Sequence, residues 1–82
     1  MIYRELGRTG LKVSQIGLGC EGFAGKDEAQ ARAMFDQALA HGVNCMDLYS
    51  PDPELRSLIG RLFRGRRDKF VMQAHLCTLW EN

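Results

Sequence analysis

The sequence predicts an α/β fold in which a parallel sheet is built from alternating strands and helices. Two amphipathic helix patterns carry this prediction, together with the short apolar runs that precede and follow them. A further observation is a pair of short extended runs around the turn sequence GRTG near the N-terminus. The predicted order is hairpin, β, α, β, α, β, which favours a parallel sheet with right-handed crossovers.

The first 13 residues predict a β-hairpin. Tyr3–Leu6 and Leu11–Val13 are the extended runs, and Gly7 and Gly10 supply the turn because glycine tolerates positive φ. The stretch SQIGLGC then predicts a short strand over residues 15–18, followed by a glycine-rich loop.

The stretch KDEAQARAMFDQALAHG predicts the first helix. Asp27 is placed to cap its N-terminus, with Gln30 three residues on, and Gly42 stands where a C-terminal glycine belongs. Apolar residues recur with the spacing of one helix face. They are Ala31, Met34, Phe35, Ala38 and Leu39.

The stretch DPELRSLIGRLFRG predicts the second helix. Asp52 is its expected N-cap, Pro53 its first residue and Gly65 its end. The same apolar spacing recurs in Leu55, Leu58, Ile59, Leu62 and Phe63. The apolar run 43–48 predicts the second parallel strand, covered on both faces, and residues 70–76 predict the third.

Length and composition restrict the possible functions. The 82 residues are enough for one small domain, and 45% hydrophobic with 26% charged residues is typical of a globular chain. A formal net charge of +1 and the absence of a long apolar run predict neither a nucleic-acid partner nor a membrane partner. The widely spaced Cys20, Cys45 and Cys77 are typical of reduced thiols, so a cytoplasmic location is expected.

Three parallel strands with two helices leave the sheet incompletely covered. Residues 1–82 are therefore expected to form a single, incomplete unit, with the hairpin in residues 1–13 and the strands and helices in residues 14–82. Open sheet edges present unpaired backbone groups, so self-association through them is expected.

Polar and titratable side chains follow the three predicted parallel strands. They are, in chain order, Gly19, Cys20, Glu21, Asp47, Tyr49, His75 and Cys77. Functional sites form at the carboxyl ends of parallel strands, so this grouping predicts a site. The alternative is structural: Asp47 caps the following loop, and His75 is a half-buried histidine with satisfied hydrogen bonds.

Three stretches, YRELGRTGLKVSQIGLGC, GVNCMDLY and SLIGRLFRGRRDKFVMQ, together resemble the N-terminal third of an aldo-keto reductase. The resemblance spans essentially the whole chain. It implies a partial (β/α)8 TIM barrel whose bottom is closed by the N-terminal hairpin. It also implies an oxidoreductase that reduces a small aldehyde or ketone with NADPH.

In that family an aspartate pairs with a lysine, the lysine tunes a proton-donating tyrosine, and a histidine orients the carbonyl. Asp47 matches the aspartate, so its charge is expected at the barrel mouth, partnered by the third strand. The tyrosine position, five residues later, holds Asp52, and Tyr49 is the nearby candidate for that role. The lysine position holds His75.

The histidine in place of lysine leads to a hypothesis about the chemistry. A histidine with an unperturbed pKa of about 6.5 supplies a positive charge only part of the time near neutrality. An Asp47–His75 pair is then its own acid–base couple, with Tyr49 as the third catalytic candidate. Gly19 and Cys20 are expected to contact the cofactor, and no metal site is expected.

The pattern MDLYSPDPELRSLIG followed by GRRDKFVMQAHLC resembles a family branch with a C-terminal ferredoxin-like segment and iron–sulfur clusters. The cluster motif does not occur in these residues, so a cluster would need a longer chain. A barrel needs roughly 250 residues, so the 82-residue chain alone is expected to be inactive. Two other functions stay open: a self-associating α/β module without enzymatic activity, and a thiol- or metal-binding sensor using Cys20, His75 and Cys77.

Overall fold

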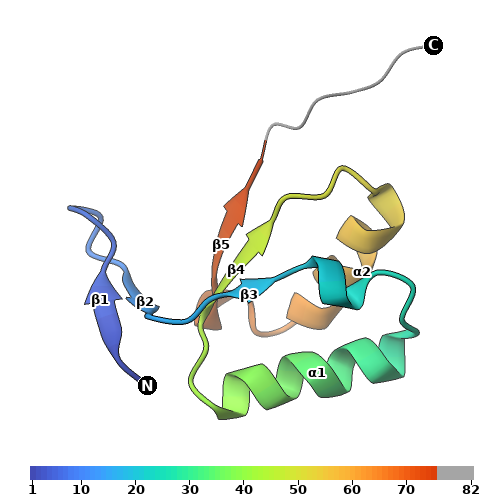
Figure 1. The fold of residues 1–82 in the computed structure, drawn as a ribbon, viewed down its shortest axis with the longest axis horizontal. Helices are drawn as coiled ribbons and strands as arrows, with labels where there is room; N and C mark the ends of the chain where they lie inside the picture. Colours follow the sequence, from blue (N-terminus) through green and yellow to red (C-terminus); the bar gives the residue numbers. More distant parts are fainter. Residues whose placement is uncertain (76–82) are drawn as a thin grey trace.

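The computed structural model describes residues 1–75, and their elements follow the predicted order (Figure 1). The strands are β1 Tyr3–Glu5, β2 Lys12–Ser14, β3 Leu18–Gly19, β4 Cys45–Leu48 and β5 Val71–Ala74. The α-helices are α1 Glu28–Ala40 and α2 Pro53–Phe63. Two short 3-10 helices, η1 Glu21–Phe23 and η2 Arg67–Lys69, were not predicted.

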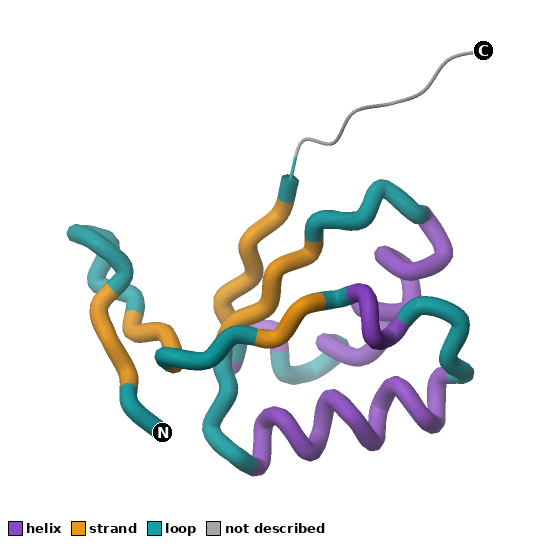
Figure 2. Tube along the Cα trace, in the orientation of Figure 1, coloured by secondary structure: helices purple, strands orange, loops and turns teal. Residues whose placement is uncertain are grey.

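The three strands β3, β4 and β5 form the predicted parallel sheet in that order (Figure 2). Burial alternates along β4: Met46 is 2% and Leu48 7% exposed, whereas Asp47 between them is exposed. Successive strand residues point to opposite faces, so the helices cover one face of the sheet. The prediction that both faces are covered is therefore wrong for the described residues: Asp47 lies on the open face.

The hairpin β1–β2 is antiparallel, with Tyr3 opposite Ser14, and β2 begins and ends one residue later than the predicted run Leu11–Val13. Gly7 and Gly10 have φ of 56° and 77°, as the turn requires. Asn44, directly before β4, attaches this hairpin to the sheet. Its Oδ1 accepts from the Ser14 amide at 2.7 Å and its Nδ2 donates to the Lys12 carbonyl at 2.8 Å. The hairpin therefore sits at the amino ends of the parallel strands.

The first parallel strand is later and shorter than predicted. It was expected over residues 15–18, and β3 covers only Leu18 and Gly19. The reason is that the preceding residues serve the hairpin: the Gln15 amide donates to the Ile2 carbonyl, and the Ser14 hydroxyl donates to the Ile16 carbonyl. The last strand was expected over 70–76; β5 ends at Ala74, and Leu76 lies outside the described residues.

Both helices begin as their capping residues predict. The Asp27 carboxylate accepts from the Gln30 amide, and the Asp52 carboxylate accepts from the Glu54 amide. All five apolar residues of the α2 stripe are buried. In α1 only Ala31 and Phe35 are fully buried, and Met34 is 38% exposed. Met34 instead lies beside Gly22 of η1, where a Cβ would meet its terminal methyl at 3.7 Å.

Three phenylalanines from separate elements form the centre of the core. Phe35 of α1, Phe63 of α2 and Phe70 before β5 have ring centroids 4.9–5.2 Å apart, with tilted and edge-to-face geometry. Such pairs add about 0.5–1.5 kcal/mol each beyond the area that they bury. These ring contacts pack the two helices against each other and against the start of the last strand.

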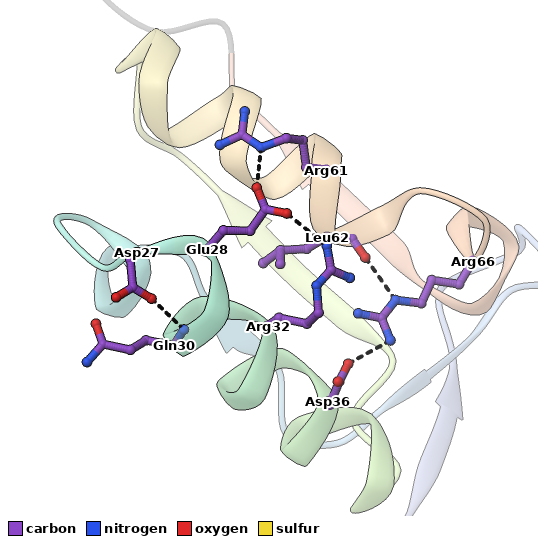
Figure 3. A network of polar contacts seen from close by, with 8 residues as sticks. All are labelled: Asp27, Glu28, Gln30, Arg32, Asp36, Arg61, Leu62 and Arg66. Atoms are coloured by element: carbon purple, nitrogen blue, oxygen red, sulfur yellow. Dashed lines mark hydrogen bonds and ion pairs between the residues drawn. The ribbon is translucent and has the colours of Figure 1, made fainter.

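Polar contacts join α1 to α2 and to the loop that follows α2 (Figure 3). Glu28 accepts from Arg61 at 2.6 Å, and Asp36 pairs with Arg66 at 2.7 Å. Arg66 also donates to the Leu62 carbonyl and lies over the Phe35 ring, 4.6 Å from its centroid. These contacts link α1 to α2 and to the loop that follows α2, in addition to the packing of the core.

Candidate functional site

The predicted Asp47–His75 contact is present at the carboxyl ends of the sheet. Asp47 of β4 is opposite Gln73 of β5, so His75, two residues further on, shares its face. The His75 Nε2 lies 2.7 Å from the Asp47 Oδ1, and the two side chains are 41% and 50% exposed. The strand register therefore brings together two residues that are 28 positions apart in sequence.

This geometry defines the chemistry that the pair can perform. An ionised carboxylate only accepts hydrogen bonds, so the 2.7 Å contact assigns a proton to Nε2 of His75. The other ring nitrogen, Nδ1, is then the one that exchanges a proton with a reacting group. The pair thus consists of a carboxylate and an imidazole in hydrogen-bond contact at an accessible edge of the sheet.

Tyr49 forms a second polar pair beside the first. Its hydroxyl donates to the Glu21 carboxylate of η1 at 3.1 Å. This hydrogen bond, with smaller contributions from burial and from the negative charge of nearby carboxylates, raises the pKa of Tyr49 above the ordinary value of 10.0. Tyr49 therefore keeps its proton at neutral pH. Glu21 had been noted as a strand-end residue, but no sequence signal linked it to Tyr49.

The two residues expected to contact a cofactor lie in different environments. Gly19 is exposed, and a Cβ built on it would meet no atom within 4 Å, so its backbone can be closely approached. Cys20 is 0% exposed and belongs to the hydrophobic core. Because this exposure counts the backbone as well as the thiol, Gly19 and not Cys20 is the part of this strand end that is open to a ligand.

Arg56 of α2 is a residue at the site that sequence reasoning missed. Its Nε donates to the Ser50 carbonyl at 2.6 Å, and its Nη2 lies 3.4 Å from the His75 carbonyl. In the helix pattern Arg56 is simply a polar position. No sequence pattern indicates that the side chain of a helical arginine contacts the segments that follow two strands.

Cysteine and metal chemistry receive no support from the described residues. Cys77, needed for the sensor hypothesis, lies outside residues 1–75, and Cys20 is buried. Within residues 1–75, no group of three or more His, Cys, Asp or Glu side chains is placed to hold a metal ion. None of the helices in that range is long and apolar enough to cross a membrane.

Two hollows of the described surface are lined by neither Asp47 nor His75. One of about 680 Å³ is lined by the N-terminal turns of α1 and α2. Another of about 410 Å³ lies between α2 and β5, with Leu48, Ile59, Phe63 and Met72 among its lining residues. A closed substrate pocket over the pair would need further walls beyond the open face of the sheet.

Similarity to known proteins extends over nearly the whole chain. No family model matches it. The uncharacterized oxidoreductase YqkF of Bacillus subtilis (strain 168) is 27% identical over 82 residues, which are 96% of this chain and 26% of that protein. This chain therefore spans about a quarter of the length of that relative.

Solved structures give a closer match. The aldo-keto reductase AKR11C1 from Bacillus halodurans, in its holo form, matches 99% of this chain and 28% of its own, with 30% identity and a TM-score of 0.83. A Pseudomonas aeruginosa protein described as an aldo-keto reductase matches 89% of this chain and 30% of its own, with 32% identity and a TM-score of 0.80.

The fold of this chain, with its hairpin, its parallel strands β3–β4–β5 and its two helices, is thus similar to these proteins over 89–99% of the chain. The predicted partial barrel is confirmed: the chain matches the N-terminal portion of the aldo-keto reductase fold.

Proposed function

We propose that the strand-end residues form part of the active site of an oxidoreductase that reduces a small aldehyde or ketone with NADPH, and that His75 is its acid–base residue. The observation that carries the proposal is the 2.7 Å contact between Asp47 and His75 at the open carboxyl ends of β4 and β5. The likeness to an oxidoreductase and to aldo-keto reductases supports the reaction class.

His75 handles the proton of this reaction. When protonated, its Nδ1 donates to the carbonyl oxygen of the substrate, and in the reverse direction the same nitrogen accepts the alcohol proton. Asp47 holds the ring in the required orientation and balances the charge of the imidazolium. Proton transfer by a positioned side chain contributes about 10²–10⁴-fold to a rate.

Tyr49 has a different part in this proposal. Its hydroxyl donates to Glu21, and its raised pKa keeps it neutral. A phenol held in this way orients a polar group of the substrate by hydrogen bonding, and it is a weaker acid than an ordinary tyrosine. The assignment of the proton to His75 follows from this difference between the two pairs.

The exposed end of β3 fits the cofactor. NADPH, when bound, supplies the hydride. The open backbone of Gly19 allows a flat ring to lie against the strand end, because no side chain occupies the space above it. The buried Cys20 supports this position through its place in the core.

Binding can be tested on the 82-residue chain itself. NADPH is titrated into the labelled chain, and shifts of the Gly19, Asp47 and His75 signals are expected in an amide NMR spectrum. Gly19→Val should abolish these shifts without unfolding the chain, because the added side chain points into open space. Gly60→Ala on the exposed side of α2 is the matched control. A spectrum indifferent to NADPH would contradict the cofactor assignment for this part of the barrel.

Turnover is a property of a closed barrel, so the 82-residue chain alone should reduce no carbonyl. In a chain that contains the whole barrel, His75→Gln should lower kcat by about 10²–10⁴-fold. Asp47→Asn should also lower kcat, because the amide can donate to Nε2 and reverse the ring tautomer. Unchanged turnover in His75→Gln would rule out the acid–base role.

A second candidate function is a self-associating module without enzymatic activity. The observation that favours it is the number of large apolar side chains exposed near the hairpin. They are Met1, Ile2, Tyr3, Leu6, Leu11 and Ile16, with exposures of 46–63%. Open strands at both sheet edges, β3 and β5, add unpaired backbone groups among the described residues.

A further inference from the structure

We propose that Arg56 is a positioning residue that holds His75 against Asp47 by joining the loop after β4 to the end of β5. This inference rests on the proposed function, because it concerns the orientation of the residue that we propose as the acid–base group. The position of the His75 imidazole ring itself can be measured without substrate or cofactor.

The Asp47–His75 pair needs support from elsewhere because it is half exposed. The two side chains are 50% and 41% accessible, and ion pairs at such positions typically contribute only about 0–1 kcal/mol. A pair of this exposure adds little restraint of its own, so the position of the ring depends strongly on the backbones that carry the two residues. The backbones that carry the two residues must therefore be held by other contacts.

Arg56 makes contacts of this kind on both sides. Its Nε donates to the carbonyl of Ser50, three residues after Asp47, at 2.6 Å. Its Nη2 lies 3.4 Å from the carbonyl of His75 itself. One planar guanidinium therefore joins the two segments that carry the acid–base pair, using donors fixed in a single fork.

The helix that carries Arg56 is a firm base for this function. Leu55 beside it is 5% exposed, and Ile59 one turn later is 1% exposed. The Asp52 cap fixes the start of α2, and Arg56 lies in its first turn, with its amide donating to the Asp52 carbonyl. Movement of the guanidinium relative to the sheet is thus restricted by the core.

Lysine cannot replace arginine in this arrangement. An ammonium group keeps the charge but presents its donors from one point, so it cannot keep both carbonyls at hydrogen-bond distance in this fork geometry. Arg56→Lys therefore separates positioning from charge. Arg61→Lys is the matched control, because Arg61 lies on the same helix and its side chain pairs with Glu28 of α1.

The experiment measures proton exchange of the His75 Nε2–H with water by NMR in the 82-residue chain. Arg56→Lys should speed this exchange by about tenfold, the effect of losing about 1.4 kcal/mol of restraint. Arg61→Lys should leave the rate within about twofold, and the dispersion of the core signals checks that each variant is folded. Arg56→Gln should give the same result as Arg56→Lys.

Equal exchange rates in Arg56→Lys and the unmodified chain would overturn the proposal. A second measurement needs no variant: the Arg56 Nε–H should exchange slowly in the unmodified chain because it donates to Ser50 at 2.6 Å. Rapid exchange there would also overturn it. Failure of NADPH binding or of carbonyl reduction, with these NMR results intact, would refute only the proposed function.

Discussion

Replacement of Asn44 by alanine should release the hairpin from the parallel sheet. The Asn44 side chain makes two hydrogen bonds across this junction, to the Ser14 amide at 2.7 Å and to the Lys12 carbonyl at 2.8 Å. Ser14 is 4% exposed, so its amide would lose its acceptor in a place that water reaches poorly. Aspartate at position 44 would keep the acceptor and lose the donor.

The magnitude follows from these contacts. Each hydrogen bond contributes about 0.5–1.5 kcal/mol net, and an orphaned buried donor costs about 1–3 kcal/mol, so Asn44→Ala should cost about 2–3 kcal/mol. A chain of this length has a free energy of unfolding of about 4–12 kcal/mol. The loss is therefore large but leaves the sheet and helices folded.

Amide hydrogen exchange locates the loss. Exchange of the Ser14 amide should become about 30–150-fold faster in Asn44→Ala. This factor is the expected loss of about 2–3 kcal/mol, converted at about 1.36 kcal/mol per factor of ten. Asn44→Asp should lie between Asn44→Ala and the unmodified chain. Thr9→Val is the control, since the Thr9 hydroxyl bonds only within the exposed turn, at 2.6 Å from the Leu6 carbonyl. Unchanged exchange at Ser14 in Asn44→Ala would refute the docking argument.

Three further predictions concern the core, the surface charges and assembly. In urea denaturation, Leu62→Ala at a fully buried position should lower the free energy of unfolding by about 2–5 kcal/mol. Leu11→Ala, at a position that is 46% exposed, should lower it by less than about 0.5 kcal/mol. Equal effects of the two substitutions would contradict the placement of the core. Hydrogen bonds from Arg61 and, to a smaller extent, Arg32 lower the pKa of Glu28 below its ordinary value of 4.5. Glu28 therefore stabilises the fold fully above pH 4.5, and this stabilisation is lost as the pH falls through the lowered pKa. Thermal midpoints should thus fall less on acidification in Glu28→Gln than in the unmodified chain, and parallel pH profiles would exclude this contribution. In sedimentation equilibrium the average mass should rise with protein concentration because the sheet edges are open, whereas a constant mass of one chain would exclude self-association.

Local features of the fold were predictable because they depend on residues close together in sequence. Asp27 and Asp52 cap their helices as expected, since a capping carboxylate reaches amides two or three positions on. The α2 stripe is buried in full because its spacing matches the helix period. The β3 boundary was wrong because Gln15 bonds to Ile2, a competing contact that no local pattern reveals.

The candidate site was predictable as a set of residues, and of its internal contacts only the Asp47–His75 pair was expected. Asp47, Tyr49 and His75 were singled out because they follow predicted strands, which is a matter of sequence position alone. The partners within the set were harder to assign: Tyr49 contacts Glu21, and Cys20 turns its thiol into the core. Arg56 was missed because it belongs to a helix, whereas the sequence prediction considered only residues that follow strands.

By itself the sequence determined the order of strands and helices, their caps and the side of each helix that is buried, because these depend on periodicity and on neighbours within a turn. The family resemblance predicted that Asp47 and His75 meet, whereas only the tertiary structure decided that Tyr49 meets Glu21 and that Arg56 reaches the His75 carbonyl. The His75–Asp47 and Tyr49–Glu21 contacts each join residues 28 positions apart. Such contacts exist only once the parallel register places Asp47 opposite Gln73 and Gly19 opposite Asp47, because a shift of one residue would turn these side chains to the opposite face.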